Sequence, residues 1–445
     1  MIVAKDWTPL PLGVRGRQVG VDYEYELAAP SVRFTFRAVR EARNGLRAEV
    51  RVDSIEPGAE GDILQDQITL ISTRSKNSLA KTLGARTKLS IAWEEIVELV
   101  ALTTADTYRE GEPFVYLKDI ADEPLDRAFL VRYLLPYLQP TVLYGDGMAG
   151  KSLFSLAMGI CVACGLALPG LTPLQEAQAV LYLDWETTAS THAYYLRCIE
   201  QAHGIEVPHD QMIYRRMSRS LQLEAHRIRR EIDQHQVGLL IVDSMIPACG
   251  GEPESAEVVM TFFNAIRGLG PITALILSHL TKFEAQRKGL PRPFGSVFTS
   301  NLARSTWLAR RAELGSAGVL ELGLYHTKTN FGRLHEPRGT RFRFEQDTIT
   351  LSEFELEDVP ELSAHVPLSR RVRGILKRGP TTVSEIADTL AANRASVRKS
   401  LHRMKDVIVV SESPGMATTW ALKSYQADPS LQDQLVDDDG NPIPF

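Results

Sequence analysis

The spacing of hydrophobic positions changes along the chain, and each pattern predicts a different kind of structure. In the first 120 residues, apolar and polar side chains alternate in stretches such as VRFTFRAV and LRAEVRVDSI, which is typical of half-buried strands. The later stretch SIAWEEIVELVALTTADTYREG places Ile91, Ile96, Leu99 and Val100 on one side of a helix. Residues 1–122 are therefore predicted to form a β-rich N-terminal accessory domain.

The middle of the chain has a second pattern, in which short apolar strands alternate with helices. The strands TVLYG, AVLYLDWE, MIYRRM, LLIVDS and ITALILSH are almost continuously apolar, as strands are in a parallel sheet covered on both faces. Later stretches, among them VLELGLYHT and DTITLSEFELE, indicate antiparallel strands. The prediction is an α/β domain over residues 123–357 with a parallel central sheet.

The C-terminal part has a third pattern, of three short helices and a hairpin. The stretches LSRRVRGILKRG, TTVSEIADTL and NRASVRKSLHRMK predict the helices, and VIVVSESPGMATTWAL predicts the hairpin. This order is typical of a winged helix-turn-helix and is assigned to residues 366–424. Residues 425–445 carry five aspartates and no lysine or arginine, so an acidic, disordered tail is predicted there.

The composition of the 445 residues is that of a globular protein, with 44% hydrophobic residues and a net charge of −5. The N-terminus shows no basic region followed by a long apolar stretch. The longest apolar run, near residues 153–171, is broken by glycines and Pro169, which favours a core helix over a membrane span. These features predict a cytoplasmic protein without a membrane partner.

One motif in the middle domain carries clear chemistry. The stretch GDGMAGKS fits the phosphate-binding pattern GxxxxGK[ST] and lies between a predicted strand and a predicted helix, as this motif requires. Its backbone N–H groups would hold the phosphates of ATP, Lys151 would reach the β and γ phosphates, and Ser152 would bind Mg²⁺. The predicted nucleotide-binding residues are Gly145, Asp146, Gly147, Met148, Ala149, Gly150, Lys151, Ser152 and Leu153.

Acidic side chains follow two of the other strands. Asp243 ends the strand LLIVD, where a carboxylate can hold the Mg²⁺ shell, although aspartate also suits a helix N-cap. Glu186 follows the strand VLYLD and is the predicted group that activates water, with Asp184 as its rival. His279 ends a third strand and is predicted to sense the γ-phosphate; the alternative is an ordinary core or surface histidine.

Taken in order, these motifs with PFGSVFTSNLARSTW and YHTKTNFGR resemble RecA-fold ATPases related to plasmid RepA-type replicative helicases, in the DnaB/RecA-like superfamily. The resemblance covers about residues 125–345. It implies a ring, usually a hexamer, that uses ATP to move on single-stranded DNA. The N-terminal domain and the winged helix depart from the compact RepA enzymes, which leaves open whether this motor unwinds DNA.

The resemblance also implies roles for particular residues. Lys151, Ser152 and Asp243 match the nucleotide and metal ligands, Glu186 the water-activating glutamate, and His279 the sensor. In such rings a cation from the neighbouring subunit completes the site and stabilises charge on the transferred phosphoryl group. Lys328 and Arg333 both lie at the matching place, and either is a candidate. Otherwise they are surface charges.

Two basic segments are candidates for DNA contact. The loop after His279 would face the channel of such a ring, or be an ordinary surface loop, and its cations are Lys282, Arg287, Lys288 and Arg292. Residues 366–424 hold eleven lysines and arginines against four acids, a net charge of +7. Their third helix could meet duplex DNA or another subunit, and the candidate contacts are Arg394, Arg398 and Lys399.

The sequence thus predicts an ATP-dependent DNA motor in replication or recombination, with Mg²⁺ as cofactor and copies of itself as ring partners. Two alternatives stay open: a non-unwinding ATPase that loads or remodels recombination proteins, and an ATP-switched DNA-binding regulator. The ending DDDGNPIPF resembles the acidic tip of bacterial single-stranded-DNA-binding proteins. It would bind a replication or recombination protein, block the chain's own basic surfaces, or only aid solubility.

Overall fold

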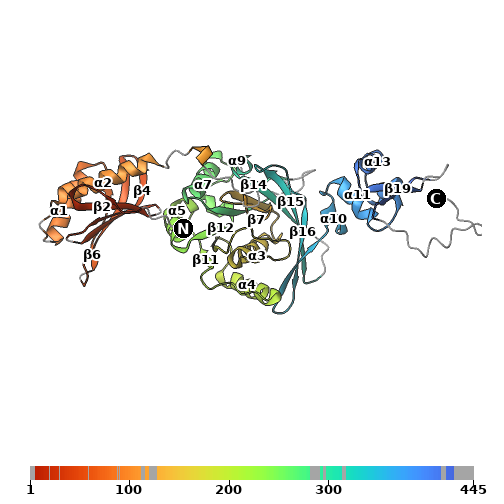
Figure 1. Cartoon of the computed structure of the whole chain (residues 1–445), viewed down its shortest axis with the longest axis horizontal. Coiled ribbons are helices and arrows are strands. Elements are labelled where there is room, and N and C mark those ends of the chain that lie inside the picture. The colour runs from red at the N-terminus through yellow and green to blue at the C-terminus, as the bar shows by residue number, and fades with distance from the viewer. Residues whose placement is uncertain are drawn as a thin grey trace, which may run out of the picture.

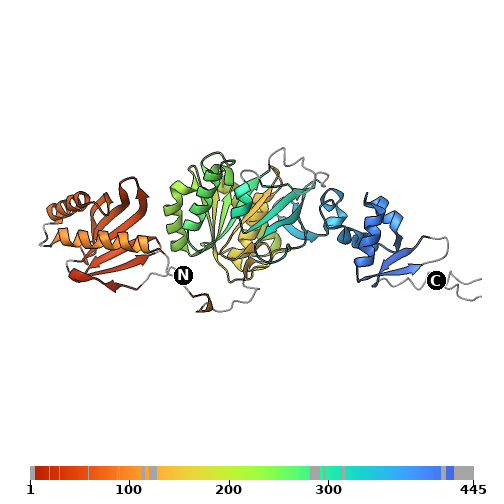
Figure 2. The same cartoon turned by 90° about the horizontal axis from the view of Figure 1, so that it is seen from above.

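The computed structural model describes residues 6–19, 21–29, 31–58, 60–87, 89, 91–111, 116–119, 128–280, 291–293, 297–312, 317–411 and 417–424. Three folded units follow one another along the chain, each with its own sheet and its own hydrophobic core (Figures 1 and 2). Among these described residues, none of the helices combines the length and apolar character needed to cross a membrane.

The first unit is a six-stranded antiparallel sheet with two helices on one face (Figure 2). Alternation turns Phe34 and Phe36 inward, where they pack with Leu79 and Leu83 of α1 and with α2. The helix α1 was not predicted, because it has few apolar residues. The elements are β1 (Thr8–Pro9), β2 (Val14–Val19), β3 (Asp22–Leu27), β4 (Val32–Ala42), β5 (Gly45–Ser54), β6 (Gly61–Thr69), α1 (Thr73–Thr87) and α2 (Trp93–Glu110).

The second unit is built on a nine-stranded sheet with the order β11-β10-β12-β13-β9-β14-β15-β16-β17. The strands from β11 to β14 pair in parallel and those from β14 to β17 antiparallel, which confirms the predicted mixed sheet with a parallel centre. The strands are β9 (Pro140–Gly145), β10 (Ala179–Asp184), β11 (Met212–Arg216), β12 (Val237–Asp243), β13 (Thr273–His279), β14 (Ser305–Arg311), β15 (Val319–Thr329), β16 (Arg338–Phe344) and β17 (Ile349–Phe354).

Both faces of this sheet are covered, which explains why its strands are apolar throughout. Val180 and Tyr182 of β10 face the core around α3, whereas Leu181 and Leu183 face the core around α5 and α7. The helices are α3 (Lys151–Cys164), α4 (Ala189–His203), α5 (Leu221–His235), α6 (Met245–Cys249), α7 (Ala256–Gly268) and α9 (Val297–Leu302), and a hairpin of β7 (Phe129–Val131) and β8 (Leu135–Pro136) precedes β9.

The third unit follows a short connection made of a 3₁₀ turn, η4 (Leu356–Asp358), and α10 (Pro360–Ser363). Its three helices surround a small core that includes Val372, Ile386, Leu401 and Trp420. A capping box between Thr382 and Glu385 starts the second helix. The elements are α11 (Leu368–Leu376), β18 (Thr381–Thr382), α12 (Val383–Thr389), α13 (Arg394–Arg403), β19 (Val407–Ser411) and β20 (Thr419–Leu422).

Candidate nucleotide site

The predicted phosphate loop lies at the carboxyl end of β9, between β13 and β14. Gly145 pairs with His279 on one side and with Ala309 on the other, and α3 starts at Lys151. Gly150 has a φ of 88°, and a Cβ there would lie 2.9 Å from a methyl carbon of Leu320. A side chain at Gly150 would be strained by the positive φ and would lie too close to Leu320, so the position requires glycine.

The other predicted loop residues form the turn between β9 and α3. Asp146 and Gly147 are exposed, and the Met148 side chain points into solvent with 89% of its surface accessible. Ala149 is buried, as is Leu153, whose side chain joins the core around α3. These residues would contact a nucleotide through their backbone N–H groups, because the first N–H groups of a helix have no partner within it.

Lys151 is folded back onto this loop. Its Nζ donates hydrogen bonds to the carbonyl oxygens of Gly145, at 3.0 Å, and Asp146, at 2.7 Å, and only 6% of the residue is exposed. Burial lowers the pKa of Lys151, while the negative charges of Asp243, Glu186 and Asp146 act in the opposite direction. A phosphate group would offer this ammonium a stronger, fully charged acceptor than two carbonyl oxygens.

Asp243 and Ser152 meet at the start of α3, as expected for a magnesium site. Burial raises the pKa of Asp243, and hydrogen bonds from Ser152 and Tyr182 oppose that rise. The Tyr182 hydroxyl donates to Asp243 Oδ2 at 2.8 Å and so fixes the carboxylate. A buried carboxylate beside a hydroxyl fits Mg²⁺, which uses few protein oxygens and completes its shell with phosphates and water.

Within the described part of the chain, no three His, Cys, Asp or Glu side chains are grouped to hold a metal by themselves. Any Mg²⁺ at this place would arrive with the nucleotide, whose phosphates would supply further ligands. The protein groups at hand are the Ser152 hydroxyl and the Asp243 carboxylate. When bound, the ion would neutralise charge on the phosphates and polarise the bond to the leaving group.

Glu186 lies between two other strand ends. Its Oε1 accepts a hydrogen bond from the Ser244 hydroxyl, next to Asp243, and lies 3.2 Å from His279 Nε2. The hydrogen bond from His279 is the main reason that the pKa of Glu186 is lowered, followed among the lowering causes by the one from Ser244. The carboxylate is thus charged at neutral pH, 44% exposed, and joined to His279 beside the phosphate loop.

Asp184, the rival of Glu186, is fully buried and has a different arrangement. Its Oδ1 accepts the backbone N–H groups of Glu186, at 2.7 Å, and Thr187, at 3.0 Å. Its Oδ2 lies 3.0 Å from His192 Nε2 and accepts the Tyr214 hydroxyl at 3.1 Å. Burial opposes the charge of Asp184, but these hydrogen bonds outweigh it and lower the pKa. Asp184 therefore holds the turn that carries Glu186.

The two candidate cations, Lys328 near the end of β15 and Arg333 after it, lie away from this loop in the same chain. Lys328 is next to Thr306 in the sheet, and Thr306 pairs with Val142, about 10 Å before the end of β9 at 3.3 Å per residue. The Lys328 ammonium donates to the carbonyls at the C-terminal end of α9, those of Ser300 at 2.6 Å, Asn301 at 3.1 Å and Ala303 at 2.6 Å.

Arg333 has no such engagement. It is exposed, and the described part of the chain gives it no ion pair or hydrogen bond. A stack of the Trp307, His326 and His335 rings anchors its loop. The ring planes of Trp307 and His326 differ by 4°, and those of His326 and His335 by 3°. The backbone N–H of His335 donates to His326 Nδ1 at 3.0 Å. Burial lowers the pKa of His326 to about 4, so the ring stays neutral and keeps that acceptor.

The structure describes some of the predicted DNA contacts and not others. Lys282, Arg287 and Lys288 lie outside the described residues, and Arg292 lies in the short described segment 291–293. In the third unit, Arg394 lies 3.6 Å from Asp388, with both side chains largely exposed, whereas Arg398 and Lys399 are exposed on α13. For these last two, the part of the chain that the structure describes shows no ion pair.

Several side chains that build the site were not predicted from the sequence. Tyr182, His192, Tyr214 and Ser244 all contact one of the predicted carboxylates. The sequence places two of them next to a predicted carboxylate: Tyr182 lies two residues before Asp184 on the same strand face, and Ser244 follows Asp243 directly. His192 and Tyr214 come from α4 and β11, and no local pattern announces them.

One known protein family matches the part of the chain that contains this site. Residues 107–285 match a protein family described as an AAA domain. The matched range contains the phosphate loop, Glu186, Asp243 and His279, and it ends before Lys328 and Arg333. No curated protein matches the sequence.

A crystal structure of a KaiC-like protein from the hyperthermophilic archaeon Pyrococcus horikoshii is among the similar solved structures. It is 13% identical, covers 52% of this chain and 97% of its own, and has a TM-score of 0.36. The family match and the geometry of the loop, Lys151 and Asp243 together support a P-loop core that binds ATP and hydrolyses it.

Proposed function

We propose that the chain is an ATP-driven motor of the RepA-like helicase group, which works on single-stranded DNA as an oligomeric ring and hydrolyses ATP between subunits. In this proposal Lys151 binds the phosphates, Ser152 and Asp243 hold Mg²⁺, and Glu186 activates the attacking water. His279 touches Glu186 and would report loss of the γ-phosphate through that contact. The geometry of Glu186 relative to the phosphate loop is the observation that carries the hydrolytic part.

Hydrolysis between subunits is supported by the placement of Arg333. The loop that carries it follows Thr329. This residue lies level with the start of β9, at the opposite end of the strands from the phosphate loop of the same chain. An exposed arginine held on an anchored loop, without a partner in the described part of its own chain, suits a site on a neighbouring molecule. Of the two candidate cations we favour Arg333, because Lys328 is occupied with the end of α9.

Binding of DNA by the third unit is supported by how its cations are distributed. Several cations of α11 and its end meet acidic side chains in or just before the connection: Arg370 with Glu355 and Glu357, Lys377 with Glu355, and Arg378 with Asp358. Arg373 of the same helix binds Asp406 within the third unit. On α13, Arg394 lies 3.6 Å from Asp388. The other cations of this helix and its end are exposed without ion pairs in the described part, and they are Arg398, Lys399, Arg403 and Lys405. We propose that this unit is a winged helix-turn-helix whose α13 meets duplex DNA.

Three parts of the proposal concern segments outside the described residues or partners of the chain. Lys282, Arg287 and Lys288, with Arg292, would line the channel and contact single-stranded DNA. The acidic residues 425–445 would bind a replication or recombination protein. The protein would work in the cytoplasm, where ATP and Mg²⁺ are supplied.

The proposal is tested by ATP turnover of the full-length protein with and without oligo-dT, together with the mass of the particles that ATP and DNA produce. The expected results are stimulation by the oligonucleotide and a ring visible by electron microscopy with an ATP analogue. A monomer whose turnover ignores DNA would contradict the ring motor. A forked duplex separates the remaining functions, since a loading or remodelling ATPase would leave it annealed.

A further inference from the structure

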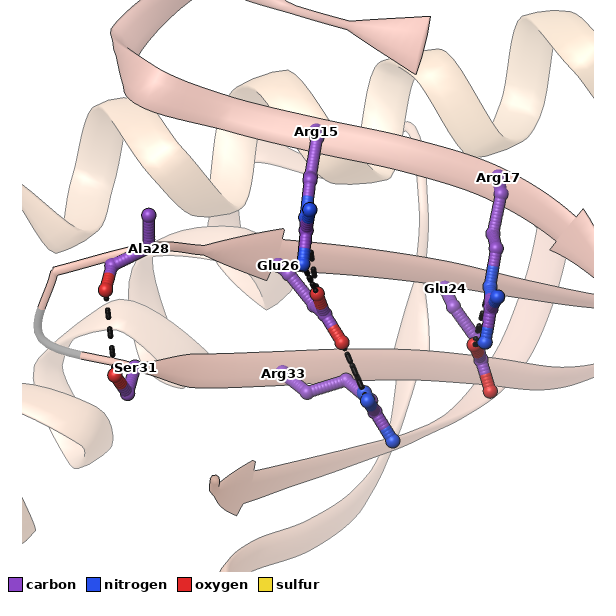
Figure 3. A network of polar contacts seen from close by, with 7 residues as sticks. All are labelled: Arg15, Arg17, Glu24, Glu26, Ala28, Ser31 and Arg33. Atoms are coloured by element: carbon purple, nitrogen blue, oxygen red, sulfur yellow. Dashed lines mark hydrogen bonds and ion pairs between the residues drawn. The ribbon is translucent and has the colours of Figure 1, made fainter. Parts of the chain in front are cut away.

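The open face of the N-terminal sheet carries charged side chains in rows across the strands. In one row Arg15 and Arg33 both bind Glu26, and in the next Arg17 binds Glu24 (Figure 3). The carboxylates lie beneath the guanidinium groups: the Glu26 side chain is 4% exposed and that of Arg15 is 54% exposed. On this face arginine charge is matched by acid charge in neighbouring strands.

The other arginines of this face also have acidic partners, except in one row. Arg51 binds Asp53, at 2.9 Å, and Asp62, and Arg37 lies 3.3 Å from Asp22. All five arginines of these rows therefore have acidic partners. The row nearest the β4–β5 turn differs, because there two arginines lie directly opposite each other on neighbouring strands.

That exceptional row consists of Arg40, Arg47 and Thr69 on β4, β5 and β6. A bulge at Ala38, whose φ is 50°, inserts one residue into β4 and so returns Arg40 to the open face opposite Arg47. Both arginines are exposed, and neither has an ion pair in the part of the chain that the structure describes. Like charges directly opposite in an antiparallel pair destabilise a sheet, so folding does not explain the pair.

This row lies where the N-terminal sheet meets α5 of the central unit. The Ala38 N–H donates to His226 Nε2 at 3.0 Å, and Arg230 of the same helix lies 3.8 Å from Asp22. Burial lowers the pKa of His226, and the positive charges of Arg230, Arg37 and Arg40 add to the effect, while the negative charge of Glu49 opposes it. Cations from both units are therefore close together at this junction.

We propose that Arg40 and Arg47, with Arg43 of the intervening turn and Arg230 of α5, form a phosphate-binding surface for the backbone of single-stranded DNA. The inference rests on the proposed DNA-dependent function and adds a contact outside the central unit and α13. A phosphate placed between Arg40 and Arg47 would remove their mutual repulsion and accept hydrogen bonds from both guanidinium groups. DNA bound there would also span the junction between the two units.

The chemistry of the row favours a phosphate backbone over an acidic protein. Its side chains are two guanidinium groups and the Thr69 hydroxyl, all of them hydrogen-bond donors. A stable protein interface needs an apolar or aromatic centre, and this row has none. Contacts made only through charge bind independently of sequence and weaken steeply with salt, as expected for a motor that moves along DNA.

The test compares two double variants of the full chain that change net charge equally on the same sheet face. Arg40→Ala/Arg47→Ala removes the unmatched pair, and Arg15→Ala/Arg51→Ala removes two arginines that have acidic partners. Binding of fluorescent oligo-dT is measured as anisotropy over a series of KCl concentrations. On single strands each phosphate contact contributes about 0.7 to the slope of log affinity against log salt, so the first variant should lose about 1.4.

The control should keep its slope, and the DNA-independent ATP turnover of Arg40→Ala/Arg47→Ala should equal that of the wild type. This variant should also melt at the same or a higher temperature, because a repulsive pair has gone. An unchanged slope, or an equal loss in the control, would overturn the surface while the proposed function stands. Equal displacement of DNA by poly-glutamate would overturn the preference for phosphate. No oligo-dT binding by the wild type would remove the proposed function itself.

Discussion

The two carboxylates at the end of β10, Asp184 in its last position and Glu186 just after it, should respond differently to loss of their charge. Glu186→Gln removes the group proposed to activate water, and Asp184→Asn removes the group that holds the turn beside it. Glu186 is 44% exposed and bonds to Ser244 and His279, whereas Asp184 is fully buried among backbone N–H groups, His192 and Tyr214. The first change should therefore affect catalysis and the second mainly stability.

The magnitudes follow from these contacts. General base catalysis contributes about 10²–10⁴-fold, so Glu186→Gln should lower kcat by that factor and leave the affinity for ATP within a few-fold. Its effect on stability should stay within about 0.5 kcal/mol, because the side chain is partly exposed. Asp184→Asn weakens hydrogen bonds to a buried charged group, each worth about 1.5–3 kcal/mol, and should cost about 2–4 kcal/mol in total.

The pH dependence of Asp184 gives a second readout with a definite sign. Its pKa in the fold is lower than the usual 3.8, so its charge stabilises the fold above about pH 4 and this contribution is lost as pH falls through the lowered pKa. The difference in melting temperature between wild type and Asp184→Asn should be full at pH 7. It should shrink below pH 4.

The assay combines single-turnover ATP hydrolysis, binding of a fluorescent ATP analogue and thermal unfolding at several pH values. Lys151→Ala serves as the control that should lose turnover by loosening the phosphates themselves. Normal turnover by Glu186→Gln would show that this glutamate does not activate water. A full catalytic loss in Asp184→Asn with unchanged stability would give that role to Asp184.

Three other predictions concern groups around the site and at the junction. Tyr182→Phe removes the hydrogen bond to Asp243, so the Mg²⁺ concentration for half-maximal turnover should rise about 10-fold, measured by titration. Lys328→Met should lower the melting temperature by freeing carbonyls of α9 and, unlike Arg333→Ala, should retain most of the turnover of the folded protein. Burial raises the pKa of Asp22 to about 6, so the free energy of unfolding should fall by up to about 3 kcal/mol as pH rises from about 4 to 6. Melting curves of Asp22→Asn should not show this decline.

The sequence predicts best what is encoded locally. The phosphate loop, the start of α3 at Lys151 and the parallel strands follow from a motif and from apolar runs, because glycines and burial on two faces leave short-range signatures. The placement of Glu186 near His279 also follows, since the carboxyl ends of parallel strands meet at one edge of the sheet.

Features that depend on distant segments could not be predicted in the same way. The environment of Asp184 comes from His192 on α4 and Tyr214 on β11, and only the strand order brings them together. The engagement of Lys328 with α9 joins residues about 25 positions apart without a shared pattern. Helix α1 was missed because packing against the sheet, and not its own periodicity, stabilises it.

Mixing two inactive variants tests most directly whether ATP is hydrolysed between subunits. Lys151→Ala lacks a working phosphate loop and Arg333→Ala lacks the cation proposed for the neighbour, so each should be inactive alone. In randomly mixed rings about one quarter of the interfaces join an intact loop to an intact arginine, and about a quarter of wild-type turnover should return. A mixture no more active than the average of the two variants would contradict a shared site.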